Sequence, residues 1–270
     1  MNIFNTLLIQ PLANGLILFY KLLFSNMGLA IVGFSLFLRV ILNPLTKPYM
    51  QSMKKMKEYE PQLAKLKEKW KGDKTKLVQA QADFYKEKGI NPGAGCLPYI
   101  LQIVVLIALF NVFARALSTS NEAVTNFNKL LYSPLKFAEN QTINTKFLYL
   151  DVTRPDIFRI PGIPFPIPGP ILLLAAIVQF LSAKMMAPLV KAEEKVAEKT
   201  KGSADDIQVA MQSSMTFTFP LFTIIFGISF PAGLALYWFL FSLYQMIQQY
   251  QTSGWGSLSP FVQKVSFWRK

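Results

Sequence analysis

One arginine lies inside a long apolar stretch of the chain. Arg39 directly follows the run from Gly28 to Leu38, in which Ser35 is the only polar side chain. A guanidinium group does not lose its proton, so placing it among lipid tails costs roughly 2.5 to 3.5 kcal/mol on insertion scales unless water or a partner group reaches it. Arg39 therefore indicates either a polar site within a membrane or a side chain that extends to a nearby water boundary.

Residues suited to metal binding or nucleophilic catalysis are scarce. The chain has no histidine and a single cysteine, Cys96. This composition excludes a disulfide framework within the chain, the usual zinc sites, and Cys/His or Ser/His catalysis. A glycine-rich loop ending in Gly-Lys-Ser/Thr is also absent from the sequence, so nucleotide hydrolysis is not indicated. We expect no enzyme activity, no metal and no cofactor.

The stretch around Arg39 is the first of several long apolar blocks. Hydrophobic residues make up 52% of the 270 residues and gather at about 27–45, 96–117, 169–190 and 213–250. A helix needs about 20 apolar residues to cross about 30 Å of hydrocarbon, so the last block is long enough for two crossings. Phe230-Pro231-Ala232-Gly233 predicts the break between them. The expected fold is an all-α membrane protein with five transmembrane helices.

The segment boundaries follow from the same pattern. The expected spans are 27–46, 95–117, 169–190, 211–230 and 231–251, joined by the segments 47–94, 118–168 and 191–210 and followed by a tail at 252–270. Asn43-Pro44 predicts the end of the first span. The proline-rich stretch 160–170 predicts an extended, stiff lead into the third span. Within residues 1–26, we expect an amphipathic helix at 11–24 in the outer interface, with a sixth span as the alternative.

The basic residues are distributed unevenly between the two ends of these spans. The segments 46–95 and 184–212 and the tail together hold 20 lysines and arginines, whereas the opposite side holds seven. By the positive-inside rule, the N-terminus is outside and the C-terminus is cytoplasmic. The net charge of +13 is then mainly a topology signal and an attraction to anionic lipid headgroups, and nucleic-acid binding is the less favoured interpretation.

The first cytoplasmic segment, 47–94, has a heptad pattern. Apolar residues recur there every seven positions, at Met56, Leu63, Trp70 and Leu77. Gly72-Asp73 interrupts the pattern, and Gly89 and Asn91-Pro92 follow its end. These features predict a hairpin of two antiparallel helices. The hairpin is either a solvated connection or an arm that contacts a partner.

Three further polar residues fall within the predicted spans, at Gln102, Gln179 and Ser182. Each either lines a polar groove or forms a hydrogen bond between helices. Arg39 also has two interpretations. If the first span ends near Thr46, seven residues at 1.5 Å each place Arg39 about 10 Å below the cytoplasmic boundary, a distance that a long side chain mostly covers.

Five motifs are spread along nearly the whole chain. They are the stretch from Gly28-Leu-Ala-Ile through Leu38-Arg39-Val-Ile-Leu-Asn-Pro44-Leu45, the stretch from Met53-Lys-Lys-Met56 to Glu60-Pro61, Asn91-Pro-Gly-Ala-Gly-Cys-Leu-Pro98, Leu148-Tyr-Leu-Asp151 and Pro231-Ala-Gly-Leu-Ala-Leu-Tyr-Trp238. In this order they resemble the YidC/Oxa/Albino membrane protein insertases, and the chain is similar to a minimal bacterial YidC type. The large extracytoplasmic domain of some bacterial members is not expected here.

The resemblance implies a hydrophilic groove that is enclosed by five helices and opens to the cytoplasm and the lipid. The groove arginine of the family matches Arg39, a glutamine of the next span matches Gln102, and Tyr237 and Trp238 fall in the motif of the last span. Gln179 and Ser182 are additional candidates for this groove. Members often carry a proline two residues after the glutamine, where this chain has Val104, so the kink at that point is not carried over.

The function implied by the resemblance is insertion and folding of newly made membrane proteins in the bacterial inner membrane. Implied partners are nascent membrane proteins and membrane lipids, with the ribosome, the signal-recognition machinery and the SecY translocon as candidates. Arg39 would attract acidic groups of a passing segment. The alternative is a small polytopic transporter or channel, which would need a continuous polar path through several spans.

The charge asymmetry predicts the accessibility of introduced cysteines. After Cys96 is replaced, single cysteines at Lys74 and at Asn126 should respond oppositely to an impermeant thiol reagent added to intact cells. The cysteine at position 126 should be labelled and the one at position 74 protected. Labelling of position 74 from outside would reverse the orientation.

Overall fold

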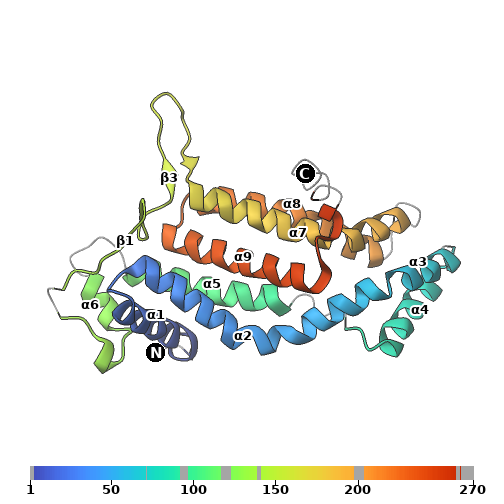
Figure 1. Cartoon of the computed structure of the whole chain (residues 1–270), viewed down its shortest axis with the longest axis horizontal. Coiled ribbons are helices and arrows are strands. Elements are labelled where there is room, and N and C mark those ends of the chain that lie inside the picture. Colours follow the sequence, from blue (N-terminus) through green and yellow to red (C-terminus); the bar gives the residue numbers. More distant parts are fainter. Residues whose placement is uncertain are drawn as a thin grey trace, which may run out of the picture. The chain divides into compact units, whose positions relative to one another are not determined.

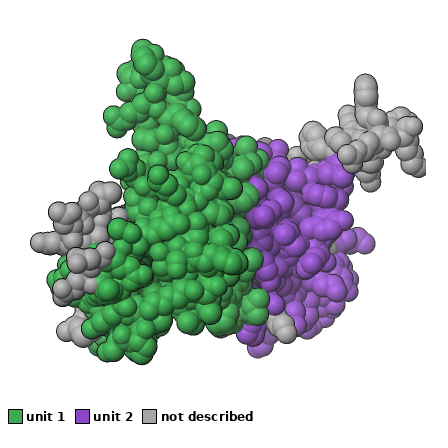
Figure 2. Space-filling model, turned by 60° about the vertical axis from the view of Figure 1, so that its left-hand side comes forward, with its two compact units in different colours: residues 1–42, 99–177, 221–242 green, residues 43–98, 178–220, 243–270 purple. Residues whose placement is uncertain are grey.

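The computed structural model of the protein describes residues 3–70, 72–91, 97–116, 123–138, 141–197, 204–259 and 262. The chain forms two compact units (Figure 2). Unit 1 consists of residues 1–42, 99–177 and 221–242, and unit 2 consists of residues 43–98, 178–220 and 243–270. Cys96, Pro92 and most of the tail predicted at 252–270 lie outside the described residues.

Helices dominate the described part of the chain, as the sequence predicts (Figure 1). In chain order they are the π-helix η1 (Asn5–Ile9), α1 (Gln10–Leu22), α2 (Met27–Glu58), α3 (Glu60–Lys69), α4 (Lys74–Glu87), α5 (Leu97–Ala116), α6 (Ala123–Asn128), the 3-10 helix η3 (Ser133–Leu135), α7 (Pro170–Ala197), α8 (Ala204–Gly227), α9 (Ala232–Ser253) and the 3-10 helix η4 (Gly256–Leu258). Two short antiparallel ribbons pair β1 (Lys146–Phe147) with β2 (Leu150–Asp151), and β3 (Ile157–Phe158) with β4 (Ile167–Pro168).

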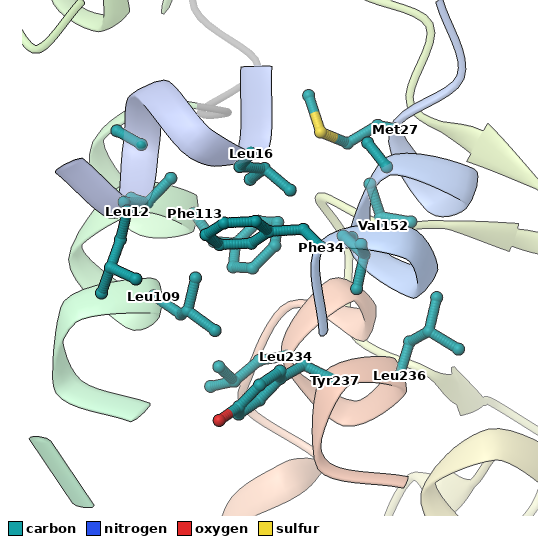
Figure 3. Close-up of a cluster of buried hydrophobic side chains, with 14 of the residues drawn as sticks. Leu12, Leu16, Met27, Phe34, Leu109, Phe113, Val152, Leu234, Leu236 and Tyr237 are labelled. Atoms are coloured by element: carbon teal, nitrogen blue, oxygen red, sulfur yellow. The ribbon is translucent and has the colours of Figure 1, made fainter. Parts of the chain in front are cut away.

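The core of unit 1 is formed where four helices meet. Side chains from α1, α2, α5 and α9 point into a common centre, represented by Leu16, Phe34, Phe113 and Leu234 (Figure 3). Gly15 lets α1 approach α2 closely, because an added Cβ at this position would collide with the ring of Phe34. Burial of these apolar side chains stabilises the unit and fixes how the four helices are rotated about their axes.

Asn14 joins α1 to the segment that follows α6. Its amide nitrogen donates to the carbonyl oxygens of Gln10 at 2.7 Å and Leu130 at 3.0 Å, and its oxygen accepts from the backbone N–H of Tyr132 at 2.7 Å. Asn14 is buried, so these bonds replace the water that its amide and the two loop groups lose on folding. The predicted outer segment 118–168 is thereby attached to a helix more than a hundred residues earlier.

The proline-rich stretch does not form the extended lead that the sequence predicts. Instead, the chain turns back between Phe158 and Ile167, and β3 pairs with β4 in an antiparallel hairpin. The turn is closed by the N–H of Ile163, which donates to the carbonyl of Ile160 at 3.1 Å, and Gly162 between them has φ +90°. Glycine adopts this backbone conformation without a steric cost, and that freedom allows the reversal.

In unit 2, the helix predicted to end at Asn43-Pro44 continues. Helix α2 runs on to Glu58 and contains both Pro44 and Pro48. A proline within a helix removes one backbone hydrogen bond but does not always stop the helix, because nearby groups can pair with the released carbonyls. The carbonyls released here are those of Val40 and Pro44, and the hydroxyl of Thr46 adds a bond within the same turn, to the carbonyl of Asn43 at 3.0 Å. The segment predicted as a hairpin at 47–94 therefore begins with a continuation of α2.

The hairpin itself is formed by α3 and α4, which pack side by side (Figure 1). The interruption predicted at Gly72-Asp73 is confirmed, because Asp73 is the N-cap of α4 and accepts from the N–H of Lys76 at 3.1 Å. Of the four heptad residues, Leu63 and Leu77 are buried. A contact between the rings of Tyr59 and Phe84, with centroids 6.1 Å apart, closes the other end of the hairpin.

One helical stretch among the described residues, Met27–Thr46, is long and apolar enough by itself to cross a membrane. Three other apolar stretches are shorter, at Leu101–Phe113, Pro170–Met185 and Thr216–Gly227. Helix α8 ends at Gly227 and α9 begins at Ala232, with Pro231 between them.

The bonds of Asn14 predict a stability difference between two like substitutions. Asn14→Ala leaves the partly buried Leu130 carbonyl and Tyr132 N–H without this partner, which should lower the free energy of unfolding by about 1–3 kcal/mol. Asn126→Ala removes only an oxygen that accepts from Lys129 in an exposed contact, so it should change stability by about 0.5 kcal/mol or less. Thermal unfolding of both variants in detergent micelles checks this. Equal losses would show that Asn14 does not hold the segment.

Candidate functional site

Arg39 lies on the face of α2 that is turned into unit 1. Ile31, Ser35 and Arg39 are spaced four residues apart and are all buried, whereas Phe37, Val40 and other residues on the opposite face are exposed. The exposed fraction of Arg39 is 8% and that of Val40 is 67%. The arginine therefore points toward other helices of the protein, and its side chain is not spread over the outer surface of α2.

Phe241 on α9 contacts the guanidinium of Arg39 in two ways. Its ring centroid lies 3.7 Å from the guanidinium carbon Cζ, and its backbone carbonyl accepts a hydrogen bond from Nη2 at 3.2 Å. A cation over an aromatic face gains about 0.5–1 kcal/mol at exposed sites and about 2 kcal/mol or more where water is removed. Both groups of Phe241 are uncharged. They orient the guanidinium without adding a negative charge next to it.

A second polar contact lies one helical turn earlier on the same face of α9. Tyr237 is four residues before Phe241, and the two ring centroids are 6.3 Å apart. The Tyr237 hydroxyl donates to Oε1 of Gln102 on α5 at 3.3 Å, and both side chains are buried. Arg39, Phe241, Tyr237 and Gln102 thus form a continuous row of contacts from α2 through α9 to α5.

The amide nitrogen of Gln102 is a buried donor without a hydrogen-bond partner among the described residues. Leaving such a donor unsatisfied costs about 1–3 kcal/mol relative to a paired one. A water molecule or a polar group of a bound segment would remove this cost. The row therefore contains the charged guanidinium of Arg39 and an amide N–H of Gln102 that can still donate a hydrogen bond. Together these groups suit the binding of a carbonyl or carboxylate group.

The other predicted site residues are not part of this row. Trp238 is buried on α9, but it follows Tyr237 directly and so points about 100° away around the helix. Ser182 is buried and Gln179 is partly buried, and both belong to the part of α7 that lies in unit 2. Their place in a groove with Arg39 remains a prediction.

Phe241 is the site residue that the sequence analysis missed. Its position four residues after Tyr237 is the signal that could have identified it, because residues with this spacing share one face of a helix. A phenylalanine in an apolar helix does not stand out as a partner for a cation. The pairing became visible only when α2 and α9 were placed side by side in unit 1.

Several helices of unit 1 present large apolar side chains to the outside. On α2 and α5 they include Leu36, Phe37, Ile41, Ile103 and Phe110, and on α7 and α8 they include Leu174, Ile177, Leu221, Ile225 and Phe226. Exposed apolar area on this scale is unusual for a surface in water and is typical of a surface that contacts lipid or another protein. The fold and the site together define a predominantly helical protein with a buried arginine and an apolar exterior.

Comparison with known families identifies this class more closely. The model of the family described as "60Kd inner membrane protein" matches residues 18–255, and the chain belongs to this family. It is therefore a membrane protein of the kind found in the bacterial inner membrane.

Curated relatives agree with this assignment. A protein of Fusobacterium nucleatum named "Membrane protein insertase YidC" is 29% identical over 226 residues, which are 84% of this chain and 85% of that protein. Proteins of the same name from Pelobacter propionicus and Syntrophobacter fumaroxidans are 32% and 30% identical over 90% and 91% of this chain. The chain spans only 38% and 37% of the length of these two relatives.

The contact between Arg39 and Phe241 predicts a spectroscopic signature. The ring current of Phe241 should shift the NMR signals of the Arg39 guanidinium away from the chemical shifts of exposed arginines. The signals are assigned to Arg39 because they are missing from the spectrum of Arg39→Lys. Phe241→Leu should return the signals toward exposed values, whereas Phe241→Tyr should leave them displaced. Phe239→Leu, on the same helix, is the matched control. Unchanged signals in Phe241→Leu would mean that the ring does not hold the guanidinium.

Proposed function

We propose that this protein is a membrane protein insertase, which inserts newly made integral membrane proteins and helps them to fold. Membership of the family and the names of the relatives support this function. The structural observation that carries the proposal is the inward-facing Arg39, held by the uncharged ring and carbonyl of Phe241. A cation kept in this way can attract an acidic group on a segment that passes through the membrane.

The proposed architecture has five spans, supplied by α2, α5, α7, α8 and α9. They enclose a hydrophilic groove that opens to the cytoplasm and to the lipid, with Arg39, Gln102, Gln179, Ser182, Tyr237 and Trp238 as its residues. The N-terminus is outside and the C-terminus is cytoplasmic, as the distribution of basic residues favours. The exposed apolar side chains of these helices support their contact with lipid.

The proposed mechanism lowers the cost of moving polar groups through hydrocarbon. Each charged residue of a client costs several kcal/mol at the centre of a bilayer. A groove that admits water shortens the dry distance, and attraction to Arg39 is stronger there than in bulk water because the local dielectric constant is lower. The amide N–H of Gln102 is placed to receive a carbonyl or carboxylate next to this charge.

The driving force in this mechanism comes from the client and the membrane. The hydrophobic helix of the client leaves the groove for the lipid, and burial of its apolar surface favours that step. The membrane potential adds about 2.3 kcal/mol per elementary charge per 100 mV. No nucleotide is required, and the protein acts as a chaperone without a chemical reaction of its own.

The proposed partners are nascent membrane proteins and membrane lipids. On the cytoplasmic side, the hairpin of α3 and α4 is a candidate contact for the ribosome, the signal-recognition machinery or the SecY translocon. Its outer surface carries exposed lysines, including Lys65, Lys69 and Lys76. Such a surface favours an acidic partner such as RNA or an anionic membrane surface.

Substitution of Arg39 separates its charge from its shape. Arg39→Ala should reduce insertion of clients with an acidic translocated segment by about tenfold or more, because a hydrogen bond to a charged group contributes about 1.5–3 kcal/mol. Clients with a neutral segment should be affected little. Arg39→Lys should keep much of the activity, since a point charge still attracts a carboxylate although the planar fork is lost. Insertion into proteoliposomes, measured with a matched pair of clients, checks these outcomes.

Arg154→Ala is the matched control, because Arg154 is exposed and its ion pair among the described residues is a 3.8 Å contact with Asp151. It should insert both clients as well as the unaltered protein does. An equal loss of both clients in Arg39→Ala would contradict the electrostatic mechanism. Steady flux of a small solute through the same proteoliposomes would instead favour a transporter or channel.

A further inference from the structure

The hairpin between β3 and β4 projects from unit 1 (Figures 1 and 2), and several of its apolar side chains are exposed. Phe158, Ile160, Ile163 and Phe165 are exposed, with Phe165 at 65%. Such a projection is unfavourable in water, because moving each of these apolar side chains out of water lowers the free energy. The surface therefore indicates an apolar partner.

The base of the hairpin is attached to the beginning of α7. Asp156 is buried and accepts from the N–H of Leu172 at 3.0 Å, and its own carbonyl accepts from the N–H of Gly169 at 2.8 Å. The Tyr149 hydroxyl accepts from the N–H of Ile171 at 3.0 Å and lies 3.2 Å from both carboxylate oxygens of Asp156. Partial burial raises the pKa of Tyr149 to about 12, so the hydroxyl keeps the proton that it donates to Asp156.

These bonds fix the hairpin at one level along α7. Gly169 leaves no room for a side chain, because an added Cβ would collide with the carboxylate of Asp156. The hairpin leaves this point across the direction of α7 and does not continue the helix axis (Figure 1). If α7 spans the membrane as proposed above, the hairpin lies at the level where the helix enters the lipid.

The apolar surface continues from the hairpin onto α7. Leu173, Leu174 and Ile177 follow within the first two turns of the helix and are exposed. These side chains face lipid in the proposed architecture, so the apolar side chains of the hairpin lie next to a surface that is already in contact with the bilayer. The nearest apolar environment for the hairpin is the outer leaflet itself.

The composition of the hairpin suits the boundary between headgroups and acyl chains. Arg159 is the only charged residue between Ile157 and Pro168, and it is exposed beside Phe158 and Ile160. A cation among apolar side chains matches the phosphates above the acyl chains. Pro161, Pro164, Pro166 and Pro168 have no backbone N–H, so four donors that would need water or a partner are absent.

We propose that the hairpin of residues 157–168 inserts its apolar side chains into the outer leaflet of the membrane. Its partner is the phospholipid bilayer, with Arg159 at the level of the phosphates and Phe165 among the upper acyl chains. The insertion anchors the outer end of α7. This inference rests on the proposed membrane architecture, but it adds a lipid contact that is separate from the site around Arg39.

The test places an environment-sensitive fluorophore on the hairpin in liposomes of phosphatidylcholine and phosphatidylglycerol. After Cys96→Ser, the label is attached at Phe165→Cys and, as the control, at Gln141→Cys, an exposed polar position of unit 1. The label at position 165 should emit at shorter wavelength and be quenched several-fold more by nitroxide lipids than by aqueous iodide. The label at position 141 should show the opposite preference.

A further variant shows whether the natural side chains cause insertion. With the label at Ile160→Cys, the added substitutions Ile163→Ser and Phe165→Ser should move the fluorophore into water and make it accessible to iodide. The proposal is wrong if the labels at 160 and 165 respond to iodide like the label at 141. This outcome would also be seen if the true partner of the hairpin were a protein that the liposomes lack.

Client insertion is measured in the same proteoliposomes, so that the two proposals can fail separately. A water-exposed hairpin in an active protein contradicts the lipid anchor alone. A lipid-buried hairpin in a protein that inserts no client contradicts the insertase function alone.

Discussion

The structure of unit 1 depends on holding a permanent cation inside a mostly apolar helix. Arg39 cannot become neutral, so its burial requires groups that replace water around the guanidinium. Phe241 supplies a ring face and a carbonyl oxygen from α9. This contact fixes which face of α2 meets α9, and the spacing of Tyr237 and Phe241 carries the constraint to Gln102 on α5. Three helices are thus aligned around one charge.

The choice of an aromatic ring as the partner has a functional consequence. A carboxylate in place of Phe241 would neutralise Arg39 and compete with any acidic group of a client. The predicted spans contain no aspartate or glutamate. A ring and a carbonyl stabilise the guanidinium without adding a negative charge beside it, as the proposed attraction of acidic segments requires.

Side-chain and backbone hydrogen bonds connect the segment 130–154 of unit 1 to α1 and α9. Asn14 satisfies two loop groups, and the N–H groups of Ala232 and Gly233 donate to the carbonyls of Arg154 and Val152 at 2.7 and 2.9 Å. The first turn of α9 is therefore attached to the segment between the two ribbons. Because α9 carries Tyr237 and Phe241, these bonds help to set the positions of the site residues one and two turns further along.

Part of the fold and part of the site could be predicted from the sequence. The apolar blocks, the helical hairpin interrupted at Gly72-Asp73 and the importance of Arg39 follow from composition and spacing, because these properties depend on residues close together in the chain. The sequence also predicted a helix break at Asn43-Pro44 and an extended lead at 160–170, and both were wrong. The apolar stretch of α2 nevertheless has the predicted bounds, Met27–Thr46. Proline alone decided neither outcome. Helix α2 continues through Pro44 and Pro48, and a turn closed by the N–H of Ile163 reverses the chain at Gly162.

Only the tertiary structure determined the surroundings of Arg39. Phe241 is more than two hundred residues away in the chain, and an apolar residue in an apolar helix carries no local sign of a cation contact. The same holds for Asp156, whose bonds to α7 depend on how the hairpin folds back. The sequence alone determined that a charge lies within a long apolar helix, and burial of a guanidinium is costly wherever it occurs. Which groups meet that charge depends on the rotation and register of packed helices, and these are set by contacts between distant parts of the chain.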